Sequence, residues 1–236
     1  MVSSILLRGY RLSVYNRIAA IVLREKGVAY EREEVDPFAP NLPVDFRQRH
    51  PFGRVPVLSH DGFDIYETTA IARYVDAIFD GPSLVPTEPK ALARMAQVVS
   101  IVDSYAYRAM VRQVFAHRVF RPLEGERADE GEIAAGLEAS HTVLGALDRI
   151  AAEGRVLEGE HVTLADCHLA PMLAYFVQAP EGAEALSLHA ALTDWWEAIS
   201  DRPSVRATDP QLPDGRPWSN RNSTGLLFRI PQSDPL

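Results

Sequence analysis

The sequence predicts two domains, a small α/β domain followed by an all-helical bundle. Strand and helix patterns alternate in residues 1–81, whereas helical periodicity alone follows the next segment. That segment, residues 82–89, is rich in proline and typical of a linker. The chain has 236 residues, enough for one large domain or for two small ones that each have a hydrophobic core. We therefore expect a helical domain at residues 90–209 and a proline-rich tail at residues 210–236.

The first half of the α/β domain has the order strand, helix, strand. Residues 5–8 and 30–35 carry the apolar, aromatic or β-branched side chains that strands favour. Between them, residues 17–25 place apolar side chains at helical spacing, and Gly27 marks the end of that helix.

The second half has the order strand, strand, helix. Asp61 and Gly62 form a hairpin-turn signal between strands expected at residues 55–59 and 63–66. Residues 70–78 then carry apolar side chains on one face of a helix.

Four amphipathic helices are expected beyond the linker, because apolar residues recur there every three or four positions. Helices at this density, joined by short loops, form a bundle. Their apolar faces contain Met95, Val99, Val102, Ala106 and Met110; Ile133, Leu137, Leu144 and Leu147; Leu164, Met172 and Tyr175; and Leu192, Trp195 and Ile199.

The composition excludes several classes of protein. Apolar residues make up 47% of the chain and charged residues 24%, as in soluble globular proteins, and no apolar run is long enough to span a membrane. We expect no signal peptide, because the N-terminus has no basic leader and no cleavage-site pattern. We also expect a cytoplasmic location, because the single cysteine, Cys167, cannot form an intramolecular disulfide. The net charge of −8 argues against a nucleic-acid partner.

One basic stretch runs against this negative balance. It contains Arg108, Arg112, His117, Arg118 and Arg121, with only apolar or amide neighbours. Two interpretations remain open: a solvated helix face whose arginine stems cover apolar surface, or a positive field that faces an anionic ligand.

Three motifs carry a resemblance to a known family. They are residues 51–58 (PFGRVPVL), 67–74 (ETTAIARY) and 163–171 (TLADCHLAP). In this order and at these separations, they resemble the cytosolic glutathione transferase superfamily over residues 4–208. The resemblance implies a thioredoxin-like N-terminal domain, a helical C-terminal domain, glutathione as co-substrate without a metal, and a symmetric homodimer.

The first motif implies a glutathione-binding turn. In the family the proline of Val-Pro is cis, which leaves the N–H and C=O of Val55 free to pair with the cysteinyl residue of glutathione. The alternative is an ordinary strand start, where proline is tolerated. The resemblance assigns Val55, Pro56, Arg54 and Tyr10 to glutathione binding.

The second motif opens a helix, where backbone N–H groups are free and the helix dipole favours an anion. The resemblance assigns Thr68 to the carboxylate of the γ-glutamyl end of glutathione and Glu67 to its ammonium group. The alternative is a capping arrangement that binds no ligand.

The third motif is interpreted as structural. Thr163 and Asp166 have the spacing of a capping box, so Asp166 is a folding residue and not a catalytic acid. Cys167 lies on an apolar face and is expected to be a buried small hydrophobe, not a reactive thiol.

Glutathione chemistry needs a thiolate, and a free thiol is only a few per cent ionised at neutral pH. The family stabilises the thiolate with a donor in the first strand–helix loop, where Ser13 matches the catalytic serine of the serine-type classes. Tyr10, Tyr15 and Asn16 are rival donors, and the alternative role of Ser13 is a helix N-cap. Cysteine is absent from this loop, which argues against the thiol-reductase branch.

The remaining contacts are less specific. For the glycine carboxylate of glutathione the candidates are Asn41, Arg47 and Gln48. For the electrophile, candidates on the long helix after the linker are Tyr105, Tyr107, Arg108 and Arg112. The predicted function is transfer of glutathione to a small hydrophobic electrophile. Alternatives are a glutathione-dependent isomerase, dehalogenase or peroxidase, or a non-catalytic binding or scaffold protein of the same fold.

Overall fold

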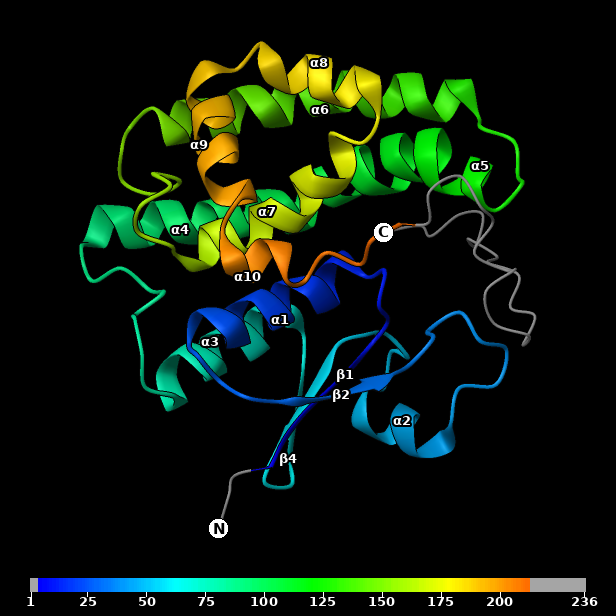
Figure 1. The fold of residues 1–236 in the computed structure, drawn as a ribbon, viewed down its shortest axis with the longest axis vertical. Coiled ribbons are helices and arrows are strands. Elements are labelled where there is room, and N and C mark those ends of the chain that lie inside the picture. Colours follow the sequence, from blue (N-terminus) through cyan, green and yellow to red (C-terminus); the bar gives the residue numbers. More distant parts are fainter. Residues whose placement is uncertain (1–3, 213–236) are drawn as a thin grey trace.

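A four-stranded mixed sheet forms the centre of the N-terminal domain, with strand order β2-β1-β3-β4. The computed structural model describes residues 4–212, and Figure 1 shows the sheet below a layer of helices. β1 pairs in parallel with β2 and antiparallel with β3, which pairs antiparallel with β4. The strands are β1 (Ile5–Gly9), β2 (Glu31–Glu34), β3 (Val57–His60) and β4 (Phe63–Tyr66). The predicted strand order along the chain is therefore confirmed.

The two faces of the sheet carry different helices. Leu58 of β3 joins a large core cluster with α1 (Val14–Glu25) and α3 (Thr68–Ile78). The next side chain toward the N-terminus, Val57, points the other way and packs with Phe46 of α2 (Val44–Arg49). The helix α2 was not predicted, because six residues are too few to establish a helical period.

The helical domain follows a linker between α3 and α4. A long helical rod comes first, and it changes to π-helical hydrogen bonding for η1 before it ends at α5. Its elements are α4 (Pro89–Ile101), η1 (Val102–Phe120) and α5 (Arg121–Leu123), followed by α6 (Glu130–Ala151), α7 (Leu164–Phe176), α8 (Pro180–Ser187), α9 (Ala190–Ser200) and α10 (Pro203–Arg206). The four expected helices are present, while α8, α10 and the π-helical geometry were not predicted.

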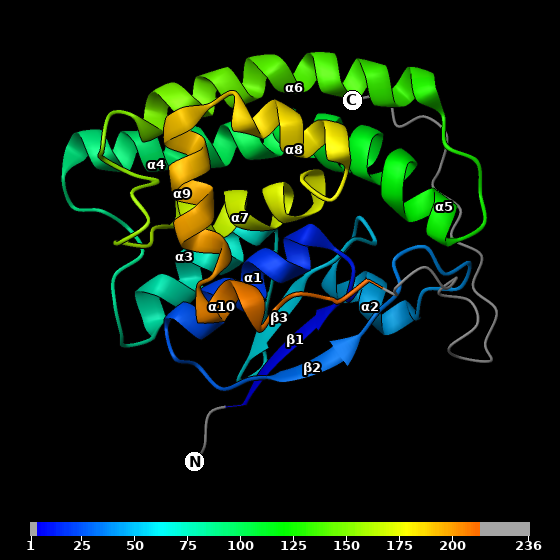
Figure 2. The same cartoon turned by 45° about the horizontal axis from the view of Figure 1, so that its top comes forward.

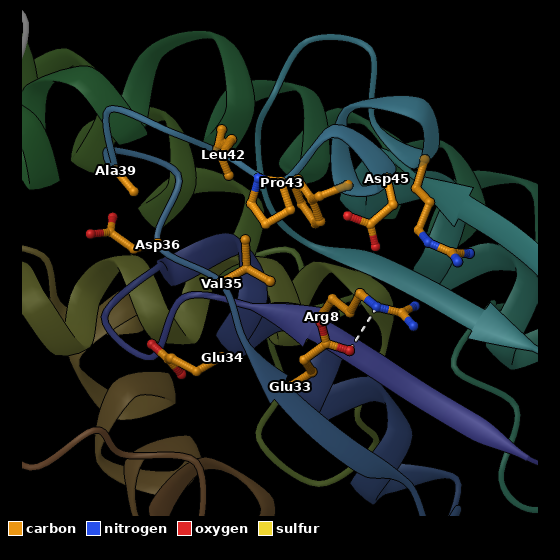
Figure 3. Close-up of a pocket in the computed structure, with 11 residues that line it drawn as sticks. Arg8, Glu33, Glu34, Val35, Asp36, Ala39, Leu42, Pro43 and Asp45 are labelled. Carbon is orange, nitrogen blue, oxygen red and sulfur yellow. Dashed lines mark hydrogen bonds and ion pairs between the residues drawn. The ribbon is translucent and has the colours of Figure 1, made fainter.

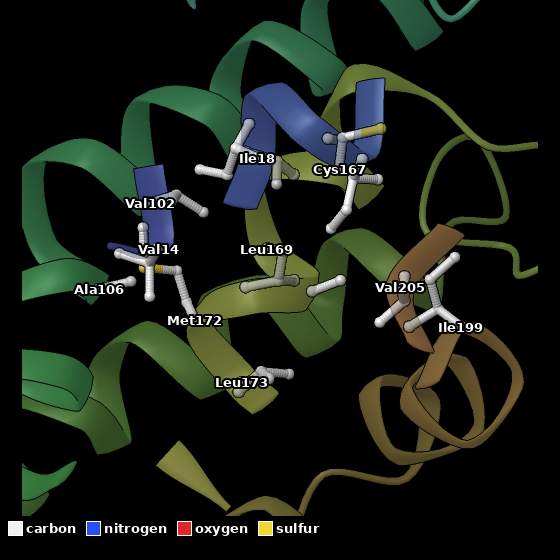
Figure 4. Close-up of a cluster of buried hydrophobic side chains, with 14 of the residues drawn as sticks. Val14, Ile18, Val102, Ala106, Cys167, Leu169, Met172, Leu173, Ile199 and Val205 are labelled. Atoms are coloured by element: carbon white, nitrogen blue, oxygen red, sulfur yellow. The ribbon is translucent and has the colours of Figure 1, made fainter. Parts of the chain in front are cut away.

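The two domains share one large hydrophobic core, in addition to the small cluster of Val57 and Phe46 on the other face of the sheet. Figure 2 shows α1 lying between the sheet and the helices of the second domain, and Figure 4 shows Val14 and Ile18 of α1 in one buried cluster with Met172 of α7. Ile18 of α1 is fully buried and belongs to the same cluster as Leu58 of the sheet and Met172 of α7. This core is shared because α1 buries its whole circumference and not a single stripe.

The third motif forms the predicted capping box at the start of α7. The Asp166 carboxylate accepts hydrogen bonds from the backbone N–H of Thr163 at 2.8 Å and its hydroxyl at 2.7 Å. Its other oxygen accepts from Nε1 of Trp195 at 2.7 Å. Asp166 is therefore structural, and Cys167 beside it is buried as expected.

A charged contact joins α1 to the last helix of the described chain. The carboxylate of Glu25 accepts two hydrogen bonds of 2.7 Å from Arg202 and another from the Ser204 hydroxyl. Burial by itself raises the pKa of Glu25, but these hydrogen bonds outweigh it, so the net shift is downward. Glu25 therefore stabilises the fold above its unfolded pKa, about 4.3, and this contribution disappears as the pH falls through the lower folded pKa.

We expect Glu25→Gln to lower the free energy of unfolding at pH 7 and to reduce its loss below pH 5. The decrease at pH 7 should lie between about 1 kcal/mol for a surface pair and about 3 kcal/mol for a buried one. Urea unfolding at several pH values measures both effects. Glu153→Gln, in the exposed pair with Arg94, is the matched control and should cost less. Equal costs at the two sites would contradict the assigned role of Glu25.

Candidate functional site

The Val55–Pro56 peptide bond is cis, as the resemblance implies. β3 begins two residues after Val55, and the first residue that it pairs with Arg8 is Val57. Within residues 4–212, the N–H and C=O of Val55 make no backbone hydrogen bond. An extended peptide that approached this turn would therefore find an available donor and acceptor.

The N-terminus of α3 lies immediately after β4. Glu67 is its N-cap and has a positive φ of 68°, and its side chain makes no capping hydrogen bond. Glu67 thus occupies the N-cap position, but its side chain does not cap the helix. Thr68, the first helical residue, is 8% exposed. The free N–H groups of this first turn and its positive dipole form a site that suits a carboxylate.

A second carboxylate, from the helical domain, approaches this N-terminus. Asp103 of η1 interacts with the hydroxyls of Thr69 and Tyr15 and lies near Glu67. Burial raises the pKa of Asp103, and the charge of Glu67 adds to this effect. Burial raises the pKa of Tyr15, and Arg54 lies close enough to oppose that shift. The sequence offered no signal for Asp103, because its proximity to Glu67 depends on how the two domains are arranged in space.

Ser13 is the N-cap of α1 and therefore keeps the structural role that we considered. Its Oγ accepts a hydrogen bond of 3.3 Å from the backbone N–H of Asn16. This bond uses a lone pair of the oxygen and leaves the hydroxyl proton available. Within residues 4–212, that hydroxyl donates to no protein group, so capping and donation to a ligand are compatible.

The three rival donors lie in different environments. Tyr10 packs edge-on against Phe38, and burial together with Asp36 raises the pKa of Tyr10. Tyr15 contacts Tyr107 with ring centroids 4.9 Å apart. Asn16 is the rival that lies furthest from solvent.

The side chain of Asn16 is enclosed beneath the end of β1. Asn16 is 2% exposed, and a Cβ added to Gly9 would lie 2.0 Å from its Oδ1. The absence of a side chain at Gly9 thus makes room for the Asn16 amide. This position differs from that of Ser13, which is only partly buried.

Two basic side chains lie beside the Val-Pro turn. Arg47, one of the candidates for the glycine carboxylate of glutathione, has its guanidinium next to Gly53. His50 is 2% exposed, lies near Glu67 and Arg54, and burial lowers its pKa. Its Nδ1 is buried and has no hydrogen-bond partner among the described residues. His50 was not predicted as a site residue, because a single histidine before a proline is not informative.

The basic stretch of η1 divides into two groups. Arg118 pairs with Glu130 and Glu181, so its charge is balanced on the surface. Arg121 is likewise paired, with Glu126. The ion pairs of Arg118 and Arg121 agree with the interpretation of this stretch as a solvated helix face.

The candidates for contact with the electrophile are the other members of η1. Arg108 and Arg112 form no ion pair in the part of the chain that the structure describes. Tyr105 is 64% exposed, whereas Tyr107 contacts Tyr15 of the first domain. The aromatic contact therefore identifies Tyr107 as an η1 residue that, like Asp103, meets α1 beside Ser13.

A cavity of about 160 Å³ lies elsewhere, between β2 and α2. Figure 3 shows its acidic lining and the ion pair of 2.9 Å between Arg8 and Glu33. None of the residues assigned to glutathione lines this cavity. Within residues 4–212, no helix is long and apolar enough to cross a membrane.

Comparison with known proteins identifies relatives of both domains. Residues 7–83 match the family model of the glutathione S-transferase N-terminal domain, and residues 130–207 match that of the C-terminal domain. Glutathione S-transferase F12 of Arabidopsis thaliana is 28% identical over 184 residues, which cover 76% of this chain and 85% of that protein.

Solved structures show the same likeness. The structure of glutathione S-transferase III in its apo form has a TM-score of 0.78 and 29% identity, covering 89% of this chain and 98% of that one. A theta-class glutathione S-transferase from Xanthomonas axonopodis pv. citri, with glutathione bound, has a TM-score of 0.73 and 28% identity, covering 88% and 97%.

Proposed function

Because the chain belongs to the cytosolic glutathione S-transferase superfamily, we propose that it activates the thiol of glutathione for attack on a small hydrophobic electrophile. The observation that supports this proposal is that residues beside three elements interact with one another: Tyr15 of α1 interacts with Arg54 and with Asp103, which also lies near Glu67. The three elements are the cis Val55–Pro56 turn, the N-terminus of α3 at Thr68 and the Ser13 hydroxyl. Each supplies a different part of glutathione with a group of matching chemistry.

Binding of glutathione is assigned to the first two elements. The unpaired N–H and C=O of Val55 suit the backbone of the cysteinyl residue. Thr68 and the free N–H groups of α3 suit the γ-glutamyl carboxylate, while Glu67 and Asp103 offer two carboxylates to its ammonium group. Arg47, beside Gly53, suits the glycine carboxylate.

Activation of the thiol is assigned to Ser13. Its hydroxyl would donate a hydrogen bond to the sulfur and favour the thiolate over the thiol, with the proton released to solvent. The thiolate then forms a carbon–sulfur bond with the electrophile, whose leaving group departs with the bonding electron pair. Tyr107, Arg108 and Arg112 of η1 are proposed to line the electrophile side, together with Tyr105.

A calorimetric titration with glutathione tests the proposal, with the ultraviolet absorbance of the thiolate followed against pH. Binding with an apparent thiol pKa well below about 8.5 would support both the site and the activation chemistry. An absence of binding at millimolar glutathione would refute the transferase function. A scaffold protein of the same fold would then be the better account.

Glu67→Gln should weaken glutathione binding by roughly 10- to 100-fold, since it removes a charge-assisted hydrogen bond to the ammonium group. Calorimetry at neutral pH measures this loss. Glu31→Gln, on the exposed edge strand β2, changes the net charge equally and should leave the affinity unaltered. Equal affinities in the two variants would exclude Glu67 from the site.

We also propose that the protein works as a symmetric homodimer in the cytoplasm. Three large apolar side chains of the N-terminal domain support an association surface, because they remain exposed in the single chain. Phe52 is 70% exposed, Phe63 55% and Ile78 52%. Sedimentation of the purified protein distinguishes the dimer from a monomer.

A further inference from the structure

We propose that Tyr175 of α7 is a positioning residue for the glutathione site: its hydroxyl holds the peptide group that precedes Ser13 and thereby directs the Ser13 hydroxyl toward the sulfur. This inference rests on the proposed function, because it concerns how the assigned donor is held in place. It starts from one hydrogen bond between the helical domain and the first strand–helix loop. The Tyr175 hydroxyl donates to the backbone carbonyl of Leu12 at a distance of 3.0 Å.

The Leu12 carbonyl depends on this tyrosine. Leu12 lies between the end of β1 and the start of α1, so its carbonyl has no place in a strand ladder or in the helix. Within residues 4–212, no backbone N–H donates to it. A main-chain carbonyl needs a donor, and the helical domain supplies it here through Tyr175.

The peptide group between Leu12 and Ser13 is therefore held at both edges. Its C=O accepts from Tyr175, and its N–H donates to the carbonyl of Tyr10 at 3.0 Å. A peptide group is planar, so bonds at opposite edges fix its plane. On the other side of Ser13, the backbone N–H of Arg17 donates to the Ser13 carbonyl at 3.0 Å. With both neighbouring peptide groups fixed, the direction of the Cα–Cβ bond of Ser13 is fixed as well.

The direction of that bond decides how well the Ser13 hydroxyl can serve a sulfur atom. One lone pair of Oγ accepts from the backbone N–H of Asn16, and the proton stays available for a ligand. Hydrogen bonds weaken steeply when the donor is turned away from the acceptor. A rotated peptide plane would therefore leave the donor present but misdirected, and the thiolate would be less stabilised.

The ring of Tyr175 is itself held in place by the helical domain. Tyr175 is 2% exposed and stacks on Phe115 of η1, with ring centroids 4.2 Å apart and ring planes 10° from parallel. Burial raises the pKa of Tyr175; Asp209 adds to this effect, and the opposing charges of Arg17 and Arg11 do not reverse it. The hydroxyl thus keeps its proton at neutral pH and acts as a donor of fixed position.

Tyr175→Phe tests the inference, because it removes the hydroxyl and keeps the ring. The pKa of bound glutathione, followed by ultraviolet absorbance, should rise by roughly half a unit to one unit, and turnover of a model electrophile should fall by roughly 3- to 10-fold. Both effects should be smaller than those of Ser13→Ala. The affinity for S-methylglutathione, which has no thiol proton, should stay within about twofold of wild type, because the charged ends of the tripeptide keep their partners.

Two further variants separate positioning from stability. In the Ser13→Ala protein, Tyr175→Phe should produce no additional rise of the thiol pKa, since the tyrosine acts through the serine hydroxyl. Tyr74→Phe is the matched control, because the Tyr74 hydroxyl lies 2.8 Å from Nδ1 of His60, a residue outside the proposed glutathione site. That variant should lower the melting temperature and leave the thiol pKa unaltered.

Two results of this series would overturn the inference. A fall in melting temperature with an unmoved thiol pKa would give Tyr175 a role in stability alone. An equal rise of the thiol pKa with and without the Ser13 hydroxyl would mean that the tyrosine does not act through Ser13.

Phe115→Leu decides the matter if Tyr175→Phe does not fold. It releases the tyrosine ring from its stack and should raise the thiol pKa by about half a unit, whereas an unchanged value would overturn the inference. Failure of the wild-type protein to bind glutathione, or to lower the pKa of its thiol, would instead refute the proposed function.

Discussion

Ser13→Ala should lower the turnover of a model electrophile by roughly 10²- to 10³-fold, the usual effect of removing one donor that stabilises a developing or full anion. The pKa of bound glutathione should rise toward the free value of about 8.5, which its ultraviolet titration measures. The affinity for glutathione should change little, because the hydroxyl contacts the sulfur and not the charged ends of the tripeptide.

The capping role of Ser13 calls for a control, since the same oxygen accepts a hydrogen bond from Asn16. Alanine is a poor N-cap and should cost about 1 kcal/mol of stability, whereas glycine costs only a few tenths. Ser13→Gly should therefore lose as much activity as Ser13→Ala while remaining more stable. Retention of activity in the glycine variant would show that the cap, and not the donor, matters.

Full activity in both variants would transfer the role to another residue. Tyr15→Phe would then be the next variant, because Tyr15 faces Tyr107 and Asp103. Asn16 would be a less informative choice. Its side chain fills the space beside Gly9, so its replacement would disturb the end of β1.

Asp166→Ala should produce a large loss of stability, roughly 3–7 kcal/mol. It removes the capping box of α7, which costs about 1 kcal/mol, and leaves the buried donors of Thr163 and Trp195 without acceptors, at about 1–3 kcal/mol each. Domains of this kind are stable by only about 5–15 kcal/mol, so the denaturation midpoint should fall sharply. Unfolding in urea or guanidinium measures the change.

Asp129→Ala is the matched control, because Asp129 caps α6 from an exposed position through Gly131 and Glu132. Its loss should be near 1 kcal/mol. A cycle with Trp195→Phe should show coupling, since Phe has no donor for Asp166 to satisfy. Similar costs at the two caps, or additive effects in the cycle, would contradict the structural role of Asp166.

The local features of the fold could be predicted because their physical causes lie in adjacent residues. The hairpin turn is an example, since Asp61 and Gly62 both adopt positive φ, 50° and 87°, as their residue types favour. The capping box of α7 is another, because Thr163 and Asp166 are three positions apart. The cis Val55–Pro56 bond required the family resemblance, as the dipeptide alone favours trans.

The features that were missed depend on contacts between distant segments. Asp103 comes close to Glu67 only after the chain brings η1 and the N-terminus of α3 together. His168 meets Thr69 from 99 positions away in the sequence. The periodicity of a sequence predicts which face of a helix or strand a side chain occupies. It does not predict which residue of another helix or strand will contact that side chain. The short helices were also not predicted, because each has too few residues to establish a helical period.

The proline-rich tail, residues 210–236, lies outside the described residues apart from positions 210–212. Its predicted place as a separate segment after the helical domain stays a prediction.

The burial of α1 on all sides has a consequence for how the chain gains and loses its structure. Ile18 contacts a core that both domains build, so neither half encloses its own apolar surface without the other. The sheet, cut away at the linker, would expose the side of α1 that α7 normally covers. The two halves therefore form a single cooperative unit, and a chimera that joins one half to a foreign partner must recreate the fit around α1 before it can fold.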